Sequence, residues 1–136
     1  MIQPLLVFSD FGILVLRIAL GLIIIAHGFP KIRDLRGTAQ GFAGMGFRPG
    51  LFWATVVALT EFVGGLAIIF GILTQFFALL LVVGFAVILV KIRLKPGARL
   101  VGGYELDLLV FAAALILATL GSGALSLDSY FGLIIY

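Results

Sequence analysis

Four ionisable residues lie within or at the edge of long apolar runs, namely Arg17, His27, Glu61 and Glu105. A guanidinium near the middle of a bilayer costs at least a few kcal/mol unless hydrogen-bond acceptors or a counter-charge compensate it. Carboxylates supply such acceptors, and histidine exchanges protons near neutral pH. These residue types therefore indicate a polar centre that could bind a ligand, transfer protons or simply hold helices together.

The depths of these residues predict how they pair. His27 is taken as the boundary of the first apolar run, and the second long run enters from the same side near residue 51. Arg17 and Glu61 then each lie ten residues inside, which is about 15 Å along a helix. We expect an Arg17–Glu61 pair near the midplane, and Glu105 beside His27 and Lys31 near the boundary.

The role of the Arg17–Glu61 pair stays open at this point. It can be a structural salt bridge that fixes helix register, since breaking a buried pair leaves an uncompensated charge. It can also be a ligand or proton site, because ionisable residues within membrane spans are often functional. Asp107 follows Glu105 by two residues, about 200° around a helix, so it should face the interface or a neighbouring subunit instead.

The composition defines the class of protein that carries these residues. The chain has 136 residues, of which 63% are hydrophobic and 11% charged, and its mean hydropathy is +1.33. A soluble domain is about half apolar and about a quarter charged. We therefore predict an all-α integral membrane protein, with residues 1–136 as one domain and no removable signal peptide at the N-terminus.

Four apolar stretches are long enough to cross a bilayer of about 30 Å. We expect an integral membrane four-helix bundle with spans at about 11–29, 51–71, 76–93 and 104–120. The first helix should end at Gly28 and Pro30. The second and third spans are expected to meet in a hairpin at Gly71 and the pair Thr74-Gln75.

The segments outside the spans carry their own signals. In the first loop, apolar residues recur at helical spacing and predict a short interfacial helix with its apolar side toward lipid; they are Ile32, Leu35, Ala39 and Phe42. The tail after the fourth span is too short to cross again. Its Tyr130 and Tyr136 are therefore expected in the membrane interface.

The basic residues predict the orientation of the chain. Eight of the nine Lys and Arg residues fall in or beside the two segments 30–50 and 91–103, and the ninth is Arg17. The positive-inside rule assigns these two loops to the cytoplasm, so both termini should be outside. We interpret Lys31 and the other loop cations mainly as topology signals and contacts to anionic lipids.

Small residues accompany the polar ones on two predicted helix faces. One stripe holds Arg17, Gly21 and Gly28, and the other holds Ala54, Ala58, Glu61 and Gly65. Small residues let membrane helices approach closely. Gly64 and Gly65 are therefore expected to form a packing notch, with close approach of a ligand as the alternative.

The set of motifs resembles the DoxX family of small prokaryotic four-span membrane proteins. The pattern R-x-x-L-G-x5-H-G-x-x-K begins at Arg17, and E-x-x-G-G-x5-G begins at Glu61. A Gly-Tyr-Glu at 103–105 and a Ser-Leu-Asp at 126–128 complete the set. The family takes its name from a subunit of an archaeal thiosulfate:quinone oxidoreductase. The resemblance implies a multi-pass protein of the prokaryotic plasma membrane with a redox partner.

Two classes of function remain. In the first, the chain is a membrane subunit or accessory of a quinone-linked oxidoreductase system. Arg17 or His27 would hold a quinone oxygen, and Glu61 or Glu105 would handle the proton. In the second, it is a non-enzymatic assembly, lipid-binding or small-molecule-binding protein. Proton-coupled transport is a weaker third option, which would require oligomerisation.

The residue inventory restricts the first class. The chain has no cysteine and one histidine, so we expect no haem, iron–sulfur or disulfide centre, and no metal site at His27 and Glu105. It would then be a quinone-binding subunit at most and not a self-sufficient enzyme. The expected partners are the lipid bilayer and either another protein or further copies of the chain, with no nucleic acid. A structural role for His27 near a helix C-terminus is the alternative to quinone binding.

Overall fold

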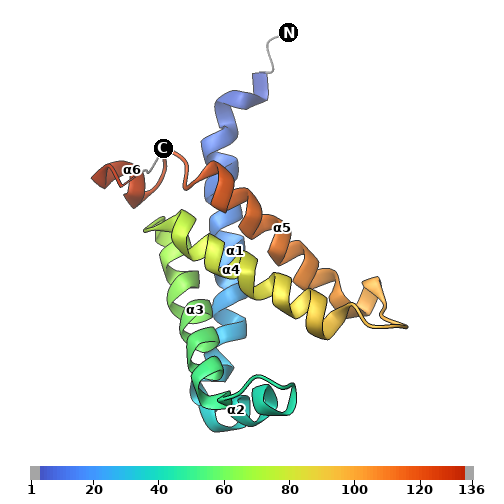
Figure 1. Cartoon of the computed structure of the whole chain (residues 1–136). Helices are drawn as coiled ribbons and strands as arrows, with labels where there is room; N and C mark the ends of the chain where they lie inside the picture. The colour runs from blue at the N-terminus through green and yellow to red at the C-terminus, as the bar shows by residue number, and fades with distance from the viewer. Residues whose placement is uncertain (1–3, 134–136) are drawn as a thin grey trace.

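The computed structural model describes residues 4–133, and its long helices confirm the four predicted spans (Figure 1). Four helices are long and apolar enough to cross a membrane. The elements in chain order are a 3-10 turn η1 (Pro4–Phe8), α1 (Ser9–Arg33), α2 (Leu35–Gly44), α3 (Gly50–Phe70), α4 (Thr74–Ile88), the π-helical turn η2 (Leu89–Arg93), the irregular turn η3 (Leu100–Tyr104), α5 (Glu105–Leu120) and α6 (Leu127–Phe131).

The long helices form two pairs that pack on each other. α1 runs along α3, and α4 runs along α5, while contacts between α3 and α4 and between α1 and α5 join the pairs. In Figure 1 the α4–α5 pair crosses the α1–α3 pair at an angle. The buried core draws on all four helices, with Ile24, Ile68, Leu81 and Leu117 among its members.

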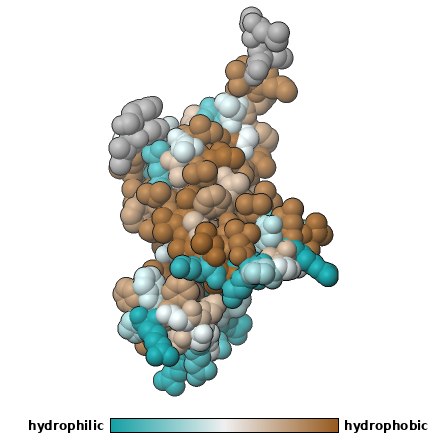
Figure 2. Space-filling model, turned by 45° about the vertical axis from the view of Figure 1, so that its right-hand side comes forward, coloured by the Kyte–Doolittle hydropathy of each residue, from teal (hydrophilic) through white to brown (hydrophobic). Residues whose placement is uncertain are grey.

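The two ends of the bundle differ in character. One end holds the α3–α4 turn and the segment 121–131 after α5; we call it the turn end. The other holds α2 and the loop between α4 and α5, with the eight basic residues outside the α1 midspan; we call it the basic end. Figure 2 shows hydrophilic residues gathered at α2 and at the projecting α4–α5 hairpin, with a largely hydrophobic zone beyond them.

The first helix is longer than predicted. We expected it to end at Gly28 and Pro30, but α1 continues through Pro30 to Arg33. A proline removes its own backbone donor, yet the turn after it is still closed, because the Asp34 N–H donates to the Pro30 carbonyl at 3.0 Å. Lys31 and Arg33 in this last turn also complement the helix dipole.

The predicted helix in the first loop exists as α2, but its apolar side does not simply face lipid. α2 packs against the start of α3, and its Leu35, Ala39 and Phe42 are half-buried. A Cβ added to Gly50 would collide with the Ala39 carbonyl, which shows how closely the two helices meet. The first turns of α3 therefore pack on α2, and the later turns pack on α1.

The predicted hairpin and the small-residue stripes are confirmed. α3 ends at Gly71, whose φ of 71° suits glycine, and α4 starts at Thr74. Gly21, Gly28 and Gly65 are buried between α1 and α3. A Cβ on Gly28 would stand 2.8 Å from the Glu61 Cβ and 2.8 Å from the Phe62 backbone nitrogen. The helices touch at the backbone here, so no side chain fits.

This contact predicts the effect of enlarging Gly28. Gly28→Ala should separate α1 from α3 and lower the free energy of unfolding in detergent by about 1–3 kcal/mol, the usual cost of overpacking. The matched control is Gly84→Ala in α4, where an added Cβ meets nothing within 4 Å. It should be neutral or stabilising by up to about 1 kcal/mol, since alanine favours the helix. Equal effects of the two changes would contradict the close contact.

Candidate functional site

Arg17 is buried, with 1% of its surface exposed, and its guanidinium is bonded to backbone carbonyls. Its Nε donates to the Ile68 carbonyl at 2.9 Å, and its Nη2 donates to the Ile69 carbonyl at 2.8 Å. Nη1 donates to the carbonyls of Ser122 at 2.8 Å and Leu125 at 2.7 Å. Arg17 thus satisfies carbonyls in the last turn of α3 and fastens the segment after α5 to α1.

A second set of contacts continues this network at the turn end. The Asp128 carboxylate accepts hydrogen bonds from the backbone N–H groups of Leu73 at 2.7 Å and Thr74 at 2.9 Å, at the N-terminus of α4. The Asp128 N–H donates to the Gly71 carbonyl at 2.7 Å. A Cβ on Gly71 would lie 2.7 Å from the Arg17 Nη2, so glycine leaves space for the guanidinium.

The predicted Arg17–Glu61 pair is therefore wrong. The depth argument failed because it put His27 level with the start of α3, whereas in the fold the neighbouring Gly28 lies level with Glu61 and the first turns of α3 pack on α2. Arg17 faces the last turn of α3, and Glu61 faces the last turns of α1 near Gly28. The two residues occupy separate polar sites.

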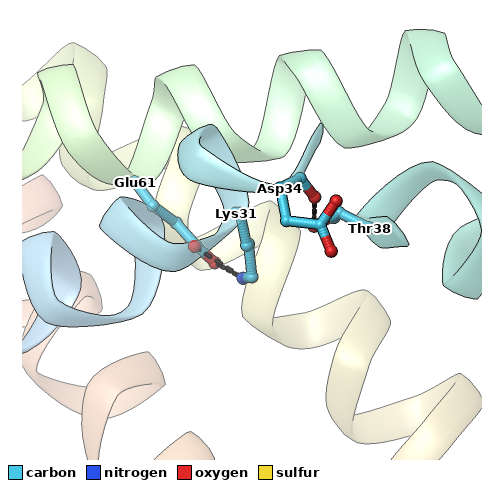
Figure 3. A network of polar contacts seen from close by, with 4 residues as sticks. All are labelled: Lys31, Asp34, Thr38 and Glu61. Carbon is cyan, nitrogen blue, oxygen red and sulfur yellow. Dashed lines mark hydrogen bonds and ion pairs between the residues drawn. The ribbon is translucent and has the colours of Figure 1, made fainter. Parts of the chain in front are cut away.

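Glu61 pairs with Lys31 instead. The Lys31 ammonium lies 2.6 Å from each oxygen of the Glu61 carboxylate (Figure 3). The Glu61 side chain is 4% exposed and the Lys31 side chain 27%. Figure 3 places this pair apart from the Asp34–Thr38 contact that starts α2. A buried carboxylate is thus neutralised by a cation that remains accessible from the flank of the helix pair.

The other predicted members of the boundary group do not join this pair. His27 is exposed, and no hydrogen bond links its side chain to another residue in the described range 4–133. It precedes Lys31 by four residues, so both side chains lie on one face of α1. Glu105 is exposed and accepts a hydrogen bond from the Gly102 N–H at 3.1 Å, within its own turn. The expected grouping of Glu105 with His27 and Lys31 is wrong.

The secondary candidates have structural partners in the fold. The Asp107 carboxylate lies 2.9 Å from the Arg93 Nε, so it reaches η2 of its own chain and not the expected interface or neighbouring subunit. Gly64 packs under Phe77, and Gly65 packs against Ile25. The interpretation of Gly64 and Gly65 as a packing notch agrees with these contacts.

Sequence reasoning missed the acidic residues of the turn end. Asp128 caps α4, and the Asp10 carboxylate accepts from the Ala124 N–H at 2.8 Å. Both tie the segment after α5 to the bundle. The need of the Arg17 guanidinium for hydrogen-bond acceptors was a signal in the sequence. We assigned the role of acceptor to a carboxylate, whereas the fold supplies backbone carbonyls. Of the two predicted interfacial tyrosines, Tyr130 is 81% exposed and Tyr136 lies outside the described residues.

Together these features define a class of protein. It is a small four-span helical membrane protein in which a buried guanidinium holds one end of the bundle together and a lysine–glutamate ion pair lies nearer the other end. The sequence profile of the DoxX family matches residues 12–93. The chain belongs to the DoxX family.

Named relatives cover most of the chain. It is 32% identical over 121 residues to a Bacillus subtilis protein named "Putative oxidoreductase CatD", covering 89% of this chain and 87% of that one. It is 38% identical over 122 residues to Inner membrane protein YqjF of Escherichia coli, covering 88% and 92%. Inner membrane protein YphA of Escherichia coli is 31% identical over 134 residues, covering 89% and 95%. No solved structure matches the chain.

The contacts of Arg17 predict a strong dependence of folding on this side chain. Arg17→Met removes four hydrogen bonds to carbonyls and should lower the free energy of unfolding by about 3–5 kcal/mol, or prevent accumulation of the protein. Arg17→Lys keeps the charge but offers a different donor geometry, so an intermediate loss is expected. The measurement is chemical unfolding in detergent. Arg36→Met, an exposed arginine of α2, is the control, and an equal loss there would contradict the prediction.

The two ion pairs should differ in their coupling energies. A double-mutant cycle with Lys31→Met and Glu61→Gln is expected to give about 1–3 kcal/mol, because Glu61 is buried. The cycle with Arg93→Met and Asp107→Asn should give about 1 kcal/mol or less, because the Arg93 side chain is 49% exposed. Unfolding titrations of the wild type and the six variants test this comparison. A larger coupling for Arg93 and Asp107 would show that burial does not set the order.

Proposed function

We propose that this protein is a membrane subunit or accessory of an oxidoreductase system, and that it handles a quinone head group beside His27 and Lys31. The observation that carries this proposal is the buried Glu61 carboxylate held by the partly exposed Lys31 ammonium. Membership of the DoxX family and similarity to a relative named as an oxidoreductase support the redox setting.

The chemistry of the pair suits proton exchange at a helix flank. Reducing a quinone to a quinol takes two electrons and two protons, so a site for it needs hydrogen-bond donors that can be reprotonated. His27 and Lys31 supply two such donors on one face of α1. The Lys31 ammonium spends two of its three N–H donors on the Glu61 carboxylate and stays partly exposed, so its third donor can reach a ligand oxygen.

The electrons must come from another protein. The chain has no cysteine and one histidine, so it lacks the ligands of an iron–sulfur cluster or a bis-histidine haem. A soluble or membrane partner that carries the redox centre is therefore part of the proposal. We place the basic end, and with it this partner, on the cytoplasmic side by the positive-inside rule.

Native mass spectrometry of protein taken from its own membrane in mild detergent tests the proposal. The wild type should carry a quinone-sized adduct, and His27→Leu should lose it while keeping the wild-type unfolding midpoint, because His27 is exposed. Arg33→Gln serves as the control: it removes a charge from the last turn of the same helix and should leave the adduct in place.

Two results would contradict the quinone assignment. The first is a wild type that carries phospholipid or a protein partner but no quinone, which would favour the assembly or lipid-binding function. The second is an adduct that persists in His27→Leu, and also in the double variant Lys31→Met/Glu61→Gln, which removes both charges together. Such an adduct would bind elsewhere on the protein.

A further inference from the structure

The α4–α5 hairpin forms a pocket that the proposed function does not use. It has a volume of about 160 Å³ and is lined by Ile92, Arg93, Ala98, Arg99, Gly103 and Tyr104. Its walls come from the end of the π-helical turn η2, the loop after it and the end of the turn η3, whose Val101 and Gly102 have non-helical backbone angles. The Leu94 N–H donates to the Leu89 carbonyl at 2.8 Å at the end of α4, and the Tyr104 N–H donates to the Arg99 carbonyl at 3.2 Å before α5.

The polar groups of this pocket are donors with unused capacity. Arg93 is anchored through its Nε to Asp107, which leaves its Nη1 and Nη2 without a hydrogen bond to any other described residue. The side chains of Arg99 and Tyr104 likewise make no hydrogen bond within residues 4–133. Two guanidinium groups and a phenol around one pocket match the oxygen atoms of a phosphate group.

The surrounding charges favour an anion there. Residues 91–107 contain four basic residues (Lys91, Arg93, Lys95, Arg99) and two acidic ones (Glu105, Asp107), a net charge of 4 − 2 = +2. Asp107 is occupied by Arg93, and Glu105 accepts from the Gly102 N–H in its own turn. The acidic groups therefore reduce the positive potential of the pocket but do not cancel it.

Exposed apolar side chains of the same hairpin favour a lipid as the source of the anion. Leu94 is 55% exposed, Leu100 48% and Val101 77%, all in the same hairpin as the two arginines. A free phosphate would make no use of these side chains, whereas a phospholipid would lay its acyl chains beside them. Figure 2 shows hydrophilic and hydrophobic surface side by side at this hairpin.

We propose that the Arg93–Arg99–Tyr104 pocket binds the phosphodiester group of an anionic phospholipid. This differs from a general attraction of basic loops to anionic membranes, because it assigns the contact to particular donors. Lys95 provides the comparison, since it lies on the same exposed hairpin but does not line the pocket. The proposal does not depend on whether His27 and Lys31 bind a quinone.

The test is native mass spectrometry of the full chain titrated with phosphatidylglycerol, phosphatidylcholine or inorganic phosphate. Phosphatidylglycerol should bind more tightly than either of the others. Arg99→Gln should weaken its binding by about fivefold, and Lys95→Gln by less than about twofold. Tyr104→Phe should also weaken it, because the variant loses one donor. Unfolding midpoints like that of the wild type are expected for Arg99→Gln and Lys95→Gln, since both residues are exposed.

Three results would overturn the proposal. Equal losses in Arg99→Gln and Lys95→Gln would show a diffuse electrostatic attraction and no site. Binding of inorganic phosphate as tight as that of phosphatidylglycerol would show a site for a free anion. Undiminished binding of phosphatidylglycerol in the double variant Arg99→Gln/Tyr104→Phe would place the lipid elsewhere on the protein.

Discussion

The placement of one charge, the Arg17 guanidinium, governs how this bundle closes. An arginine inside a membrane span must have its donors satisfied, and here backbone carbonyls do this without a carboxylate in contact. Carbonyls at a helix C-terminus carry a partial negative charge and lack the regular helical donor four residues on, so the last turn of α3 is a natural acceptor. The hydrogen bonds to the Ser122 and Leu125 carbonyls then hold the segment after α5 close to the end of α3. One side chain thereby connects three parts of the chain that are far apart in sequence.

The close contact of α1 and α3 also depends on which interactions can hold helices together in lipid. Apolar side chains gain little by leaving lipid for a helix interface, so close packing and polar contacts must hold membrane helices together. Gly21, Gly28 and Gly65 bring the two backbones together, and this brings Lys31 over Glu61. The pair is formed where α1 would have ended had Pro30 stopped it. The extra turn of α1 is therefore what compensates the buried carboxylate.

The sequence was sufficient to predict where the helices lie, but not which polar groups of different helices contact each other. Apolar run lengths, Gly71 and the small-residue stripes predicted the spans, the hairpin and the buried faces, because each depends on local composition. The partners of Arg17 and Glu61 depend on the relative height of two helices, which a few residues at one end can shift. Backbone acceptors are also invisible to pattern reading, since every residue has a carbonyl. The role of Arg17 in fastening the tail could therefore not be read from charge matching.

The separation of the two polar sites bears on where function can reside. At the turn end, each donor of Arg17 that bonds to a carbonyl is committed to holding the fold, and Asp128 is committed to the start of α4. A ligand that bound Arg17 or Asp128 would have to displace hydrogen bonds that hold the fold together. Nearer the basic end, Lys31 is held by one partner, Glu61, and its side chain stays 27% exposed, so a ligand could reach it there. The Arg17 and Glu61 charges are thus held by separate sets of partners, Arg17 by backbone carbonyls and Glu61 by a lysine, at different heights of the bundle.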